Sequence, residues 1–156
     1  MDEREGQSPG FKFNDWEMRG VPLRMEIGPK DVAKGSVVLA RRDRPGKEGK
    51  SFVSQDGIAE SVMQHLGAIQ KALLDRAQAF RNTHTFEPKN FEEFQVAVEQ
   101  GFARSYWCGD SKCEEQIKEA TKATLRCIPM EQPGGARACI FCGKPSNELA
   151  IFGKAY

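Results

Sequence analysis

Hydrophobic and polar residues alternate in the first third of the chain in a way that predicts β-strands. Residues 21–27, VPLRMEI, place an apolar residue at every second position, with Arg24 and Glu26 on the opposite face. Residues 36–43, SVVLARRD, contain an unbroken apolar run, which is typical of a strand buried on both sides. Residues 51–55, SFVSQ, predict a third, short strand. The pattern therefore predicts a small sheet.

Two helices flank this predicted sheet. Ser8 followed by Pro9 is a favourable helix start, and Gly20 is expected to end that helix. Beyond residue 56 the period changes, because apolar residues recur at intervals of three and four over about six turns. This stripe is expected to pack into a core. Its members are Ile58, Val62, Leu66, Ile69, Leu73, Ala77 and Phe80.

Helix and strand signals alternate more densely in the second half of the chain. Asn90 with Glu93 predicts the start of a helix that ends at Gly101 and turns its apolar side chains inward. Further strands are expected at residues 102–107, 123–130 and 148–153, with a helix at residues 113–121 and loops between them. We therefore expect two domains, residues 1–86 and residues 87–156.

The second half of the chain contains all five cysteines, and their spacing predicts a metal site. Cys139 and Cys142 enclose two residues in CIFCGK, and Cys108 and Cys113 enclose four in CGDSKC. Two close pairs separated by 25 residues are typical of a tetrahedral four-cysteine zinc site. Disulfides and idle thiols are alternatives, which the odd cysteine count and the lack of an apolar leader disfavour. A redox dithiol is disfavoured because no strand-to-helix pattern follows the pair near the chain end. Cys127, between apolar neighbours, is expected to be a buried small hydrophobe.

The overall composition excludes several classes of function. The 23 lysines and arginines balance 22 acidic residues, so no general affinity for polyanions is expected. No apolar run approaches the length of a membrane span, and the free thiols indicate a reducing, cytoplasmic compartment. There is no P-loop, no G-x-S-x-G and no paired carboxylates in an apolar setting. Because four thiolates leave zinc no open position, the metal site is expected to be structural.

Residues 10–54 differ from the rest of the chain in their charge and aromatic content. They contain ten lysines and arginines against six acidic residues, interspersed with phenylalanine and tryptophan. Aromatic rings can stack on unpaired bases while cations contact phosphates, which is how proteins bind single-stranded RNA loops. The alternative is an amphipathic helix that buries its aromatic side chains and exposes its charges.

Several stretches of the chain carry a family resemblance in combination. They are SPGFKFNDWEMRGVPLRMEIGPKD, VVLARRD, CGDSKC, LRCIP, CIFCGKP and the terminal IFGKAY. Together they resemble the carboxy-terminal part of prolyl-tRNA synthetases of the archaeal and eukaryotic type, from about residue 9 to residue 156. The resemblance implies an α/β fold, with a truncated mixed-sheet anticodon-binding domain and a long helix, followed by a small α+β zinc-binding domain. The family's zinc ligands fall on Cys108, Cys113, Cys139 and Cys142, whereas Cys127 matches a non-ligand.

The resemblance also implies which residues read the two guanines of the proline anticodon. The family's acid falls on Glu17 and its three cations on Arg24, Lys30 and Lys47, although the loop that holds Lys47 is one residue longer than in some relatives. Guanine's Watson–Crick edge offers N–H donors to a carboxylate, while its O6 and N7 atoms accept from lysine or arginine. Tyr156 matches the family's final tyrosine, which reaches toward the catalytic domain.

Much of the family's enzyme is expected to lie upstream of this chain. The catalytic domain, which binds ATP, Mg²⁺ and proline, is missing, as are the first strand, first helix and most of the second strand of the anticodon-binding domain. We therefore expect the chain alone to activate no amino acid. Its segment before Glu87 is expected to self-associate through an unprotected sheet edge or to be partly molten, while the region after Gly101 stays ordered. The expected partners are proline tRNA and a separate catalytic chain, and the family is usually homodimeric.

A second function remains open at this point. The chain would then be a stand-alone, zinc-stabilised protein-interaction module that does not bind RNA. The two functions differ in whether Glu17, Arg24 and Lys30 converge on one solvent-facing patch. An inward-facing Glu17 would favour the interaction module.

Overall fold

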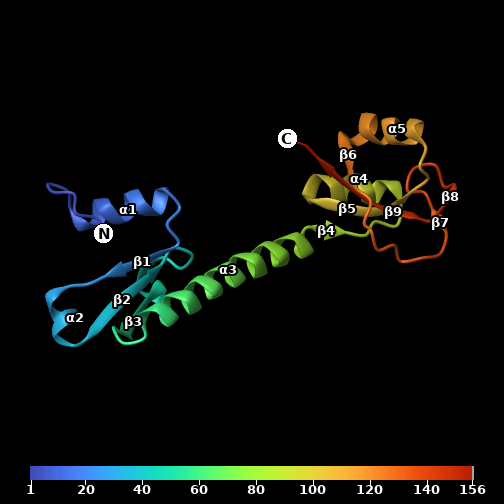
Figure 1. Cartoon of the computed structure of the whole chain (residues 1–156). Helices are drawn as coiled ribbons and strands as arrows, with labels where there is room; N and C mark the ends of the chain where they lie inside the picture. The colour runs from blue at the N-terminus through green and yellow to red at the C-terminus, as the bar shows by residue number, and fades with distance from the viewer. Residues whose placement is uncertain (156) are drawn as a thin grey trace. The chain divides into compact units, whose positions relative to one another are not determined.

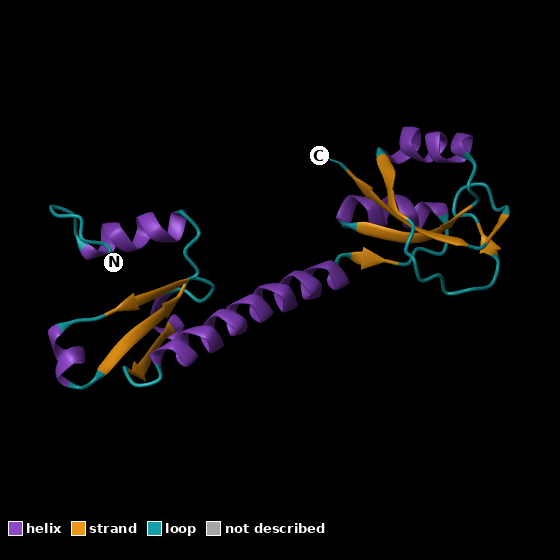
Figure 2. Ribbon diagram, in the orientation of Figure 1, coloured by secondary structure: helices purple, strands orange, loops and turns teal. Residues whose placement is uncertain are grey.

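The computed structural model describes residues 1–155, which divide into two compact units. Unit 1 is Met1–Ala77 and unit 2 is Gln78–Tyr156, and each has its own sheet (Figures 1 and 2). Tyr156, with the role predicted for it, lies outside the described residues. The division into domains between residues 86 and 87 stays a prediction.

Unit 1 is built on a three-stranded antiparallel sheet in the order β1-β2-β3. Its elements are α1 (Pro9–Met18), β1 (Leu23–Glu26), α2 (Pro29–Ala33), β2 (Ser36–Arg41), the 3₁₀ turn η1 (Gly46–Gly49), β3 (Lys50–Ser54) and the first part of α3 (Ile58–Thr83). All three predicted strands are confirmed. The unbroken apolar run forms the central strand, whose residues 37–40 are buried as expected.

The two faces of β1 are covered differently from the prediction. Its apolar side is only partly covered, since Met25 is 44% exposed and Ile27, just beyond the strand, is 56% exposed. On the opposite side, the Arg24 guanidinium lies 4.0 Å from the centre of the Phe13 ring of α1. The charged face of this edge strand is therefore the better covered one.

Helix α3 is the long helix that the apolar stripe predicts, and it runs for 26 residues. The stripe packs less than expected. Ile69 is buried, but Leu73 is 37% exposed and Phe80 is 65% exposed. Among the described residues no sheet covers the second half of α3 (Figure 1), so the prediction of core packing is wrong there. None of the helices in residues 1–155 has both the length and the apolar character needed to cross a membrane.

Unit 2 holds a four-stranded sheet in the order β4-β5-β9-β6, in which only the β4–β5 pair is parallel. Its elements are β4 (Thr85–Phe86), α4 (Phe91–Gln100), β5 (Phe102–Trp107), α5 (Ser111–Thr121), β6 (Ala123–Cys127), β7 (Arg137–Ala138), β8 (Pro145–Ser146) and β9 (Glu148–Lys154). Both predicted helices and the three longer strands are confirmed. The two-residue strands β4, β7 and β8 were not predicted, because so short a segment carries no periodicity.

The core of unit 2 is closed by side chains from its helices and its central strand. Phe94 of α4, Ile117 of α5 and Phe152 of β9 are all fully buried, and the rings of Phe94 and Phe152 meet edge to face at 5.3 Å. Helix α4 starts as predicted, since the Asn90 side chain accepts a hydrogen bond from the Glu93 backbone N–H at 2.8 Å. The sequence pattern thus located this core correctly.

Cys127 is exposed, so the prediction that it is a buried hydrophobe is wrong. It lies at the end of β6, which is an edge strand of the sheet. The pairing of β6 with β9 shifts register between Leu125 and Cys127. The strand therefore leaves the core just where its apolar neighbours suggested burial.

Candidate functional site

The sulfur atoms of the four paired cysteines converge at the edge of the core of unit 2. Those of Cys113 and Cys139 lie 3.7 Å apart, those of Cys108 and Cys142 lie 3.6 Å apart, and all four lie within 4.8 Å of one another. A tetrahedral zinc ion with Zn–S bonds of about 2.3 Å spaces its ligands about 3.8 Å apart. The four cysteines predicted from spacing are therefore the ones that the fold brings together, in an arrangement that fits a tetrahedral metal ion.

Each pair of cysteines sits on a turn that a glycine makes possible. Gly109 and Gly143 have φ angles of +77° and +73°, a left-handed conformation that side-chain-bearing residues rarely adopt. The second turn is closed by a hydrogen bond from the Gly143 N–H to the Cys139 carbonyl at 3.0 Å. The two turns can therefore direct both sulfurs of a pair to one point.

Both turns are fastened to the end of β5. The Ile140 N–H donates to the Tyr106 carbonyl at 2.9 Å, and the Ser146 hydroxyl donates to the Trp107 carbonyl. Trp107 directly precedes Cys108, so these bonds tie the second cysteine pair to the start of the first. Sequence reasoning missed Ser146, because a lone serine after a turn gives no distinctive signal.

The environments of the four sulfurs shift the cysteine pKa values in different directions. Burial raises the pKa of Cys113 and of Cys108, because it penalises the charged form. Cys139 is buried as well, but the backbone N–H groups of Cys142, Phe141 and Cys108 lower its pKa to about 7. A metal ion binds thiolates, so its binding would have to displace protons from the cluster.

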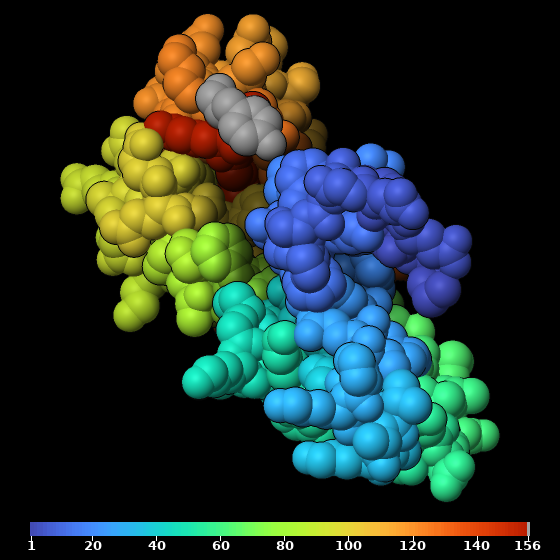
Figure 3. All heavy atoms as spheres, turned by 90° about the vertical axis from the view of Figure 1, so that its left-hand side faces the viewer, coloured from blue at the N-terminus to red at the C-terminus, as the bar shows by residue number. Residues whose placement is uncertain are grey.

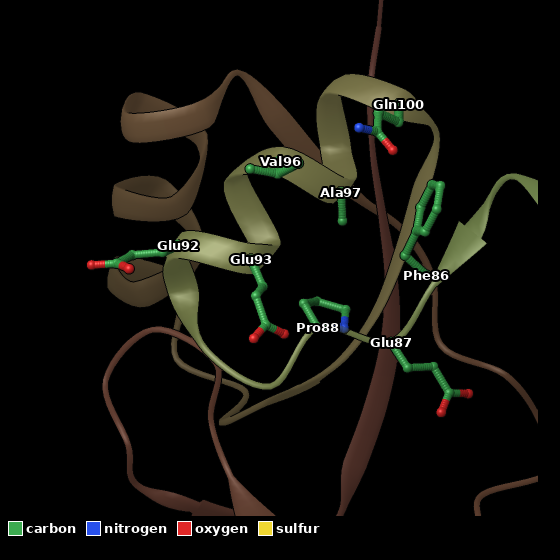
Figure 4. A pocket seen from close by; sticks show the side chains of 8 residues that line it. All are labelled: Phe86, Glu87, Pro88, Glu92, Glu93, Val96, Ala97 and Gln100. Atoms are coloured by element: carbon green, nitrogen blue, oxygen red, sulfur yellow. The ribbon is translucent and has the colours of Figure 1, made fainter.

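Unit 2 also has an open groove of about 490 Å³ beside α4. Its lining combines the apolar residues Phe86, Val96 and Ala97 with the acidic residues Glu87, Glu92 and Glu93. Figure 4 shows the side chains of Glu87 and Glu92 pointing away from each other on opposite sides of the groove. Because carboxylates repel phosphates, this groove is a poor candidate for binding RNA.

In unit 1, the fold brings two of the predicted RNA-reading residues into contact. Glu17 lies in the last turn of α1 and Arg24 in β1, and Gly20, with φ +92°, allows the chain to reverse between them. The Arg24 guanidinium donates to the Glu17 carboxylate at 2.5 Å. The side chains of Arg24 and Glu17 are 19% and 40% exposed, so the carboxylate does not pack inward.

The other two predicted residues are exposed but are not joined to this pair. Lys30 lies in α2, and Lys47 lies in the turn η1. Within residues 1–155 the structure gives neither lysine an ion pair. The space-filling view shows α1 and the region of β1 and α2 on the same face of unit 1 (Figure 3). Convergence is therefore established for Glu17 with Arg24 but not for the two lysines.

Sequence reasoning placed Glu26 on the same face as Arg24 but missed the ion pairs that Glu26 makes. Glu26, on the same face of β1, accepts from the Arg24 guanidinium at 3.0 Å and from the Lys50 ammonium at 2.9 Å. Ala40 of the central strand pairs with Arg24 on one side and with Lys50 on the other. The two-residue period of the strand had placed Glu26 on the same face as Arg24, but only the sheet register brings in Lys50.

The aromatic side chains of α1 are not buried, contrary to the alternative of an amphipathic helix. Phe11 is 54% exposed and Trp16 is 38% exposed. The guanidinium groups of Arg4 and Arg19 lie over the Trp16 ring, at 5.6 and 5.3 Å from its centre. These rings remain partly accessible for stacking, although arginines already occupy part of the Trp16 surface.

Two family models match the chain. A model for the anticodon-binding domain matches residues 1–56, and a model for the C-terminal domain of prolyl-tRNA synthetase matches residues 91–156. The two matches lie on either side of α3 and cover the three-stranded sheet of unit 1 and the cysteine cluster of unit 2.

Proteins similar to this chain over its whole length are proline–tRNA ligases. The one from Roseiflexus castenholzii is 53% identical over 156 residues, and the one from Chloroflexus aurantiacus is 51% identical over 156 residues. The chloroplastic/mitochondrial proline–tRNA ligase of Arabidopsis thaliana is 42% identical over 160 residues. Each alignment covers 100% of this chain, but only 32%, 32% and 30% of the respective relative. The chain thus spans about a third of the length of the curated relatives it matches.

Proposed function

Because the chain belongs to the prolyl-tRNA synthetase family, as its anticodon-binding and C-terminal region, we propose that it binds the anticodon loop of proline tRNA and recognises its guanines. The observation that carries this proposal is the contact between Glu17 and Arg24 at the surface of unit 1. An acid and a bidentate cation side by side match the donors and acceptors of one guanine base.

The proposed roles follow from the chemistry of guanine. The Glu17 carboxylate accepts from the N1–H and N2–H groups, which adenine cannot offer in the same arrangement. Arg24 donates to the O6 and N7 acceptors. Lys30 and Lys47, which are exposed on α2 and η1, supply further positive charge to bases or phosphates of the loop.

For unit 2, we propose that the four-cysteine cluster holds one structural Zn²⁺. The ligands would be Cys108, Cys113, Cys139 and Cys142, whose sulfur spacing fits the ion. Four thiolates fill the coordination sphere of zinc, so the ion would supply folding energy and no catalysis. The cluster lies against the core of unit 2, where a bound ion would fasten the two turns together.

The RNA-binding proposal is tested with two anticodon stem-loops of proline tRNA, the natural one and one with adenine in place of each anticodon guanine. Wild-type chain should prefer the guanine loop. Arg24→Lys keeps the charge but loses the bidentate geometry, so it should lose about 1 to 3 kcal/mol of this preference. Equal affinity of the wild-type chain for both loops would contradict the proposal.

The salt dependence of the affinity distinguishes a lysine that contacts a base from one that contacts a phosphate. If Lys47 contacts only phosphate, Lys47→Ala should weaken both loops equally and reduce the slope of log affinity against log salt by roughly 0.7. If Lys30 contacts a base edge, Lys30→Ala should instead weaken the guanine loop selectively.

The interaction module without RNA binding is the competing function. The exposed Glu17 carboxylate disfavours it, since this function was tied to an inward-facing Glu17. The chain spans only about a third of the length of these relatives. We propose that the parent activity, with ATP, Mg²⁺ and a catalytic domain, belongs to the part that it does not span. A cytoplasmic location also stays a prediction, because one relative is chloroplastic/mitochondrial.

A further inference from the structure

Arg24 is held by two side chains that the proposed function does not use directly, those of Phe13 and Glu26. The Phe13 ring lies 4.0 Å from the guanidinium carbon and covers one face of the group. Glu26 accepts from Nε at 3.0 Å and also lies 3.0 Å from Nη2. The ring and the carboxylate together therefore restrict the orientation of the guanidinium group.

These contacts leave part of the guanidinium group available. It has five N–H groups. Glu26 accepts from the one on Nε and lies close enough to Nη2 to engage at most one there, and Glu17 accepts from one on Nη1. Among the described residues, one N–H on each terminal nitrogen has no partner. Two donors on neighbouring nitrogens are what a bidentate contact to the O6 and N7 atoms of guanine requires.

Glu26 is in turn held in place by a residue of β3, on the same face of the sheet. The Lys50 ammonium donates to its second carboxylate oxygen at 2.9 Å, while the first oxygen faces Arg24. The Glu26 side chain is 21% exposed. Burial raises the pKa of Glu26, but hydrogen bonds from Lys50 and Arg24 outweigh this and lower it, so the carboxylate stays ionised at neutral pH.

We propose that Glu26, braced by Lys50, is a positioning residue for guanine recognition, which orients the Arg24 guanidinium so that its two free N–H groups face the base. This inference rests on the proposed function, because it names the residue that makes Arg24 specific. Glu26 itself does not touch the RNA. It acts by preventing the long arginine side chain from sampling orientations in which it would meet only phosphate.

The charge of Glu26 provides a sharp test, because two effects of its removal have opposite signs. Glu26→Gln removes a negative charge next to an RNA-binding surface, so electrostatics alone would strengthen binding to any RNA. Loss of positioning would instead weaken the guanine loop selectively. We expect the ratio of affinities for the guanine and adenine loops to fall roughly tenfold in Glu26→Gln, within the range for a lost base-edge contact.

Asp43→Asn is the matched control. Asp43 pairs with Arg41 at 2.7 Å, which is again an arginine and a carboxylate two residues apart in the same unit. The substitution removes the same charge and a similar ion pair, but it does not touch Arg24. It should leave the ratio of affinities unchanged. Glu26→Asp keeps the charge on a shorter side chain and should restore part of the ratio.

The outcomes separate the inference from the function on which it rests. If wild-type chain does not distinguish the two loops, the proposed function is wrong. If it does, but folded Glu26→Gln keeps the wild-type ratio and binds both loops more tightly, then Glu26 acts only through its charge and the inference fails. Should Glu26→Gln not fold, Lys50→Met tests the same bracing from the other end. It should lower the ratio as well as the overall affinity, whereas an unchanged ratio would overturn the inference.

Discussion

The two units stabilise themselves in different ways. Unit 2 encloses Phe94, Ile117 and Phe152 completely and adds a cluster of four cysteines at the edge of that core. Unit 1 buries four consecutive residues of its central strand and Ile69 of α3, but it leaves Phe52 76% exposed. Unit 2 thus has a closed core with a cluster of four cysteines. Unit 1 has a partly covered sheet in which only the central strand is buried.

This difference indicates where each unit depends on something outside its own chain. A closed core with four converging thiols needs only a metal ion to be complete. Exposed apolar side chains on a sheet and on the helix beside it mark a surface suited to contact with other protein. In unit 1 the large exposed side chains of this kind include Met25, Ile27, Val32, Phe52, Met63 and Leu74. We therefore expect unit 2 to respond to metal and unit 1 to respond to protein concentration.

Removal of the metal should have the largest effect and should be confined to unit 2. Cys113→Ser should release the ion and unfold unit 2, because structural zinc contributes on the order of 10 kcal/mol to folding. Cys127→Ser is the control and should retain the metal, since Cys127 is exposed and lies outside the cluster. Metal analysis and amide hydrogen exchange measure the two parts of this prediction. Reduced, freshly purified wild-type protein without zinc would contradict it.

The second-largest difference between the units is expected when one phenylalanine in each unit is replaced by alanine. Phe94→Ala should cost about 3 to 5 kcal/mol of unfolding free energy in unit 2, because it opens a cavity in a closed core. Phe52→Ala should change the stability of unit 1 by no more than about 0.5 kcal/mol. The two tryptophans allow separate measurement, since Trp16 lies in unit 1 and Trp107 in unit 2. Fluorescence of Trp16→Phe and Trp107→Phe backgrounds then reports one unit each. Equal losses from both substitutions would remove the contrast.

Self-association should depend on the exposed surface of unit 1. Sedimentation over roughly a hundredfold range of concentration should show larger species as concentration rises. Phe52→Ser should shift this equilibrium toward the monomer, because a fully buried phenylalanine contributes about 1.5 to 3 kcal/mol. Phe102→Ser, at a 41% exposed position in unit 2, is the control and should have a smaller effect. A wild-type chain that stays monomeric throughout would show that its exposed apolar surface does not associate.

The smallest effect is expected from acid, which should lower the stability of unit 1 by protonating its carboxylates. Within the described residues, the carboxyl groups with a lowered pKa all lie in unit 1, and they are Asp2, Asp15, Glu26 and Asp43. A hydrogen bond from Arg41 lowers the pKa of Asp43. Its contribution is therefore complete above the unfolded pKa of about 4 and is lost as pH falls through the lower folded pKa. Asp43→Asn should flatten the fall in Trp16-monitored stability below about pH 4. An unchanged slope would show that this pair does not contribute.

The local patterns of the sequence were sufficient for most elements and for the cysteine cluster. The alternation in VPLRMEI, the apolar run at residues 36–43 and the cap at Asn90 each correspond to an observed element. Two short cysteine turns were sufficient to predict the metal ligands, because each turn fixes its own pair of thiols and only one junction between the pairs had to be guessed. These features depend on neighbours a few residues apart along the chain.

Other features were decided only by the tertiary structure. The second half of α3 has a flawless apolar stripe yet remains exposed, since periodicity shows which face of a helix is apolar but not whether anything covers it. Cys127 has apolar neighbours, but a shifted register at a sheet edge turns it to solvent. The contact between Lys50 and Glu26, which is next to Arg24, joins residues 24 positions apart through the register of three strands. The sequence by itself determined the elements and the four cysteines that cluster, because these depend on local patterns. Only the sheet register and the packing decided what surrounds the proposed guanine-reading arginine, because they depend on contacts between distant segments.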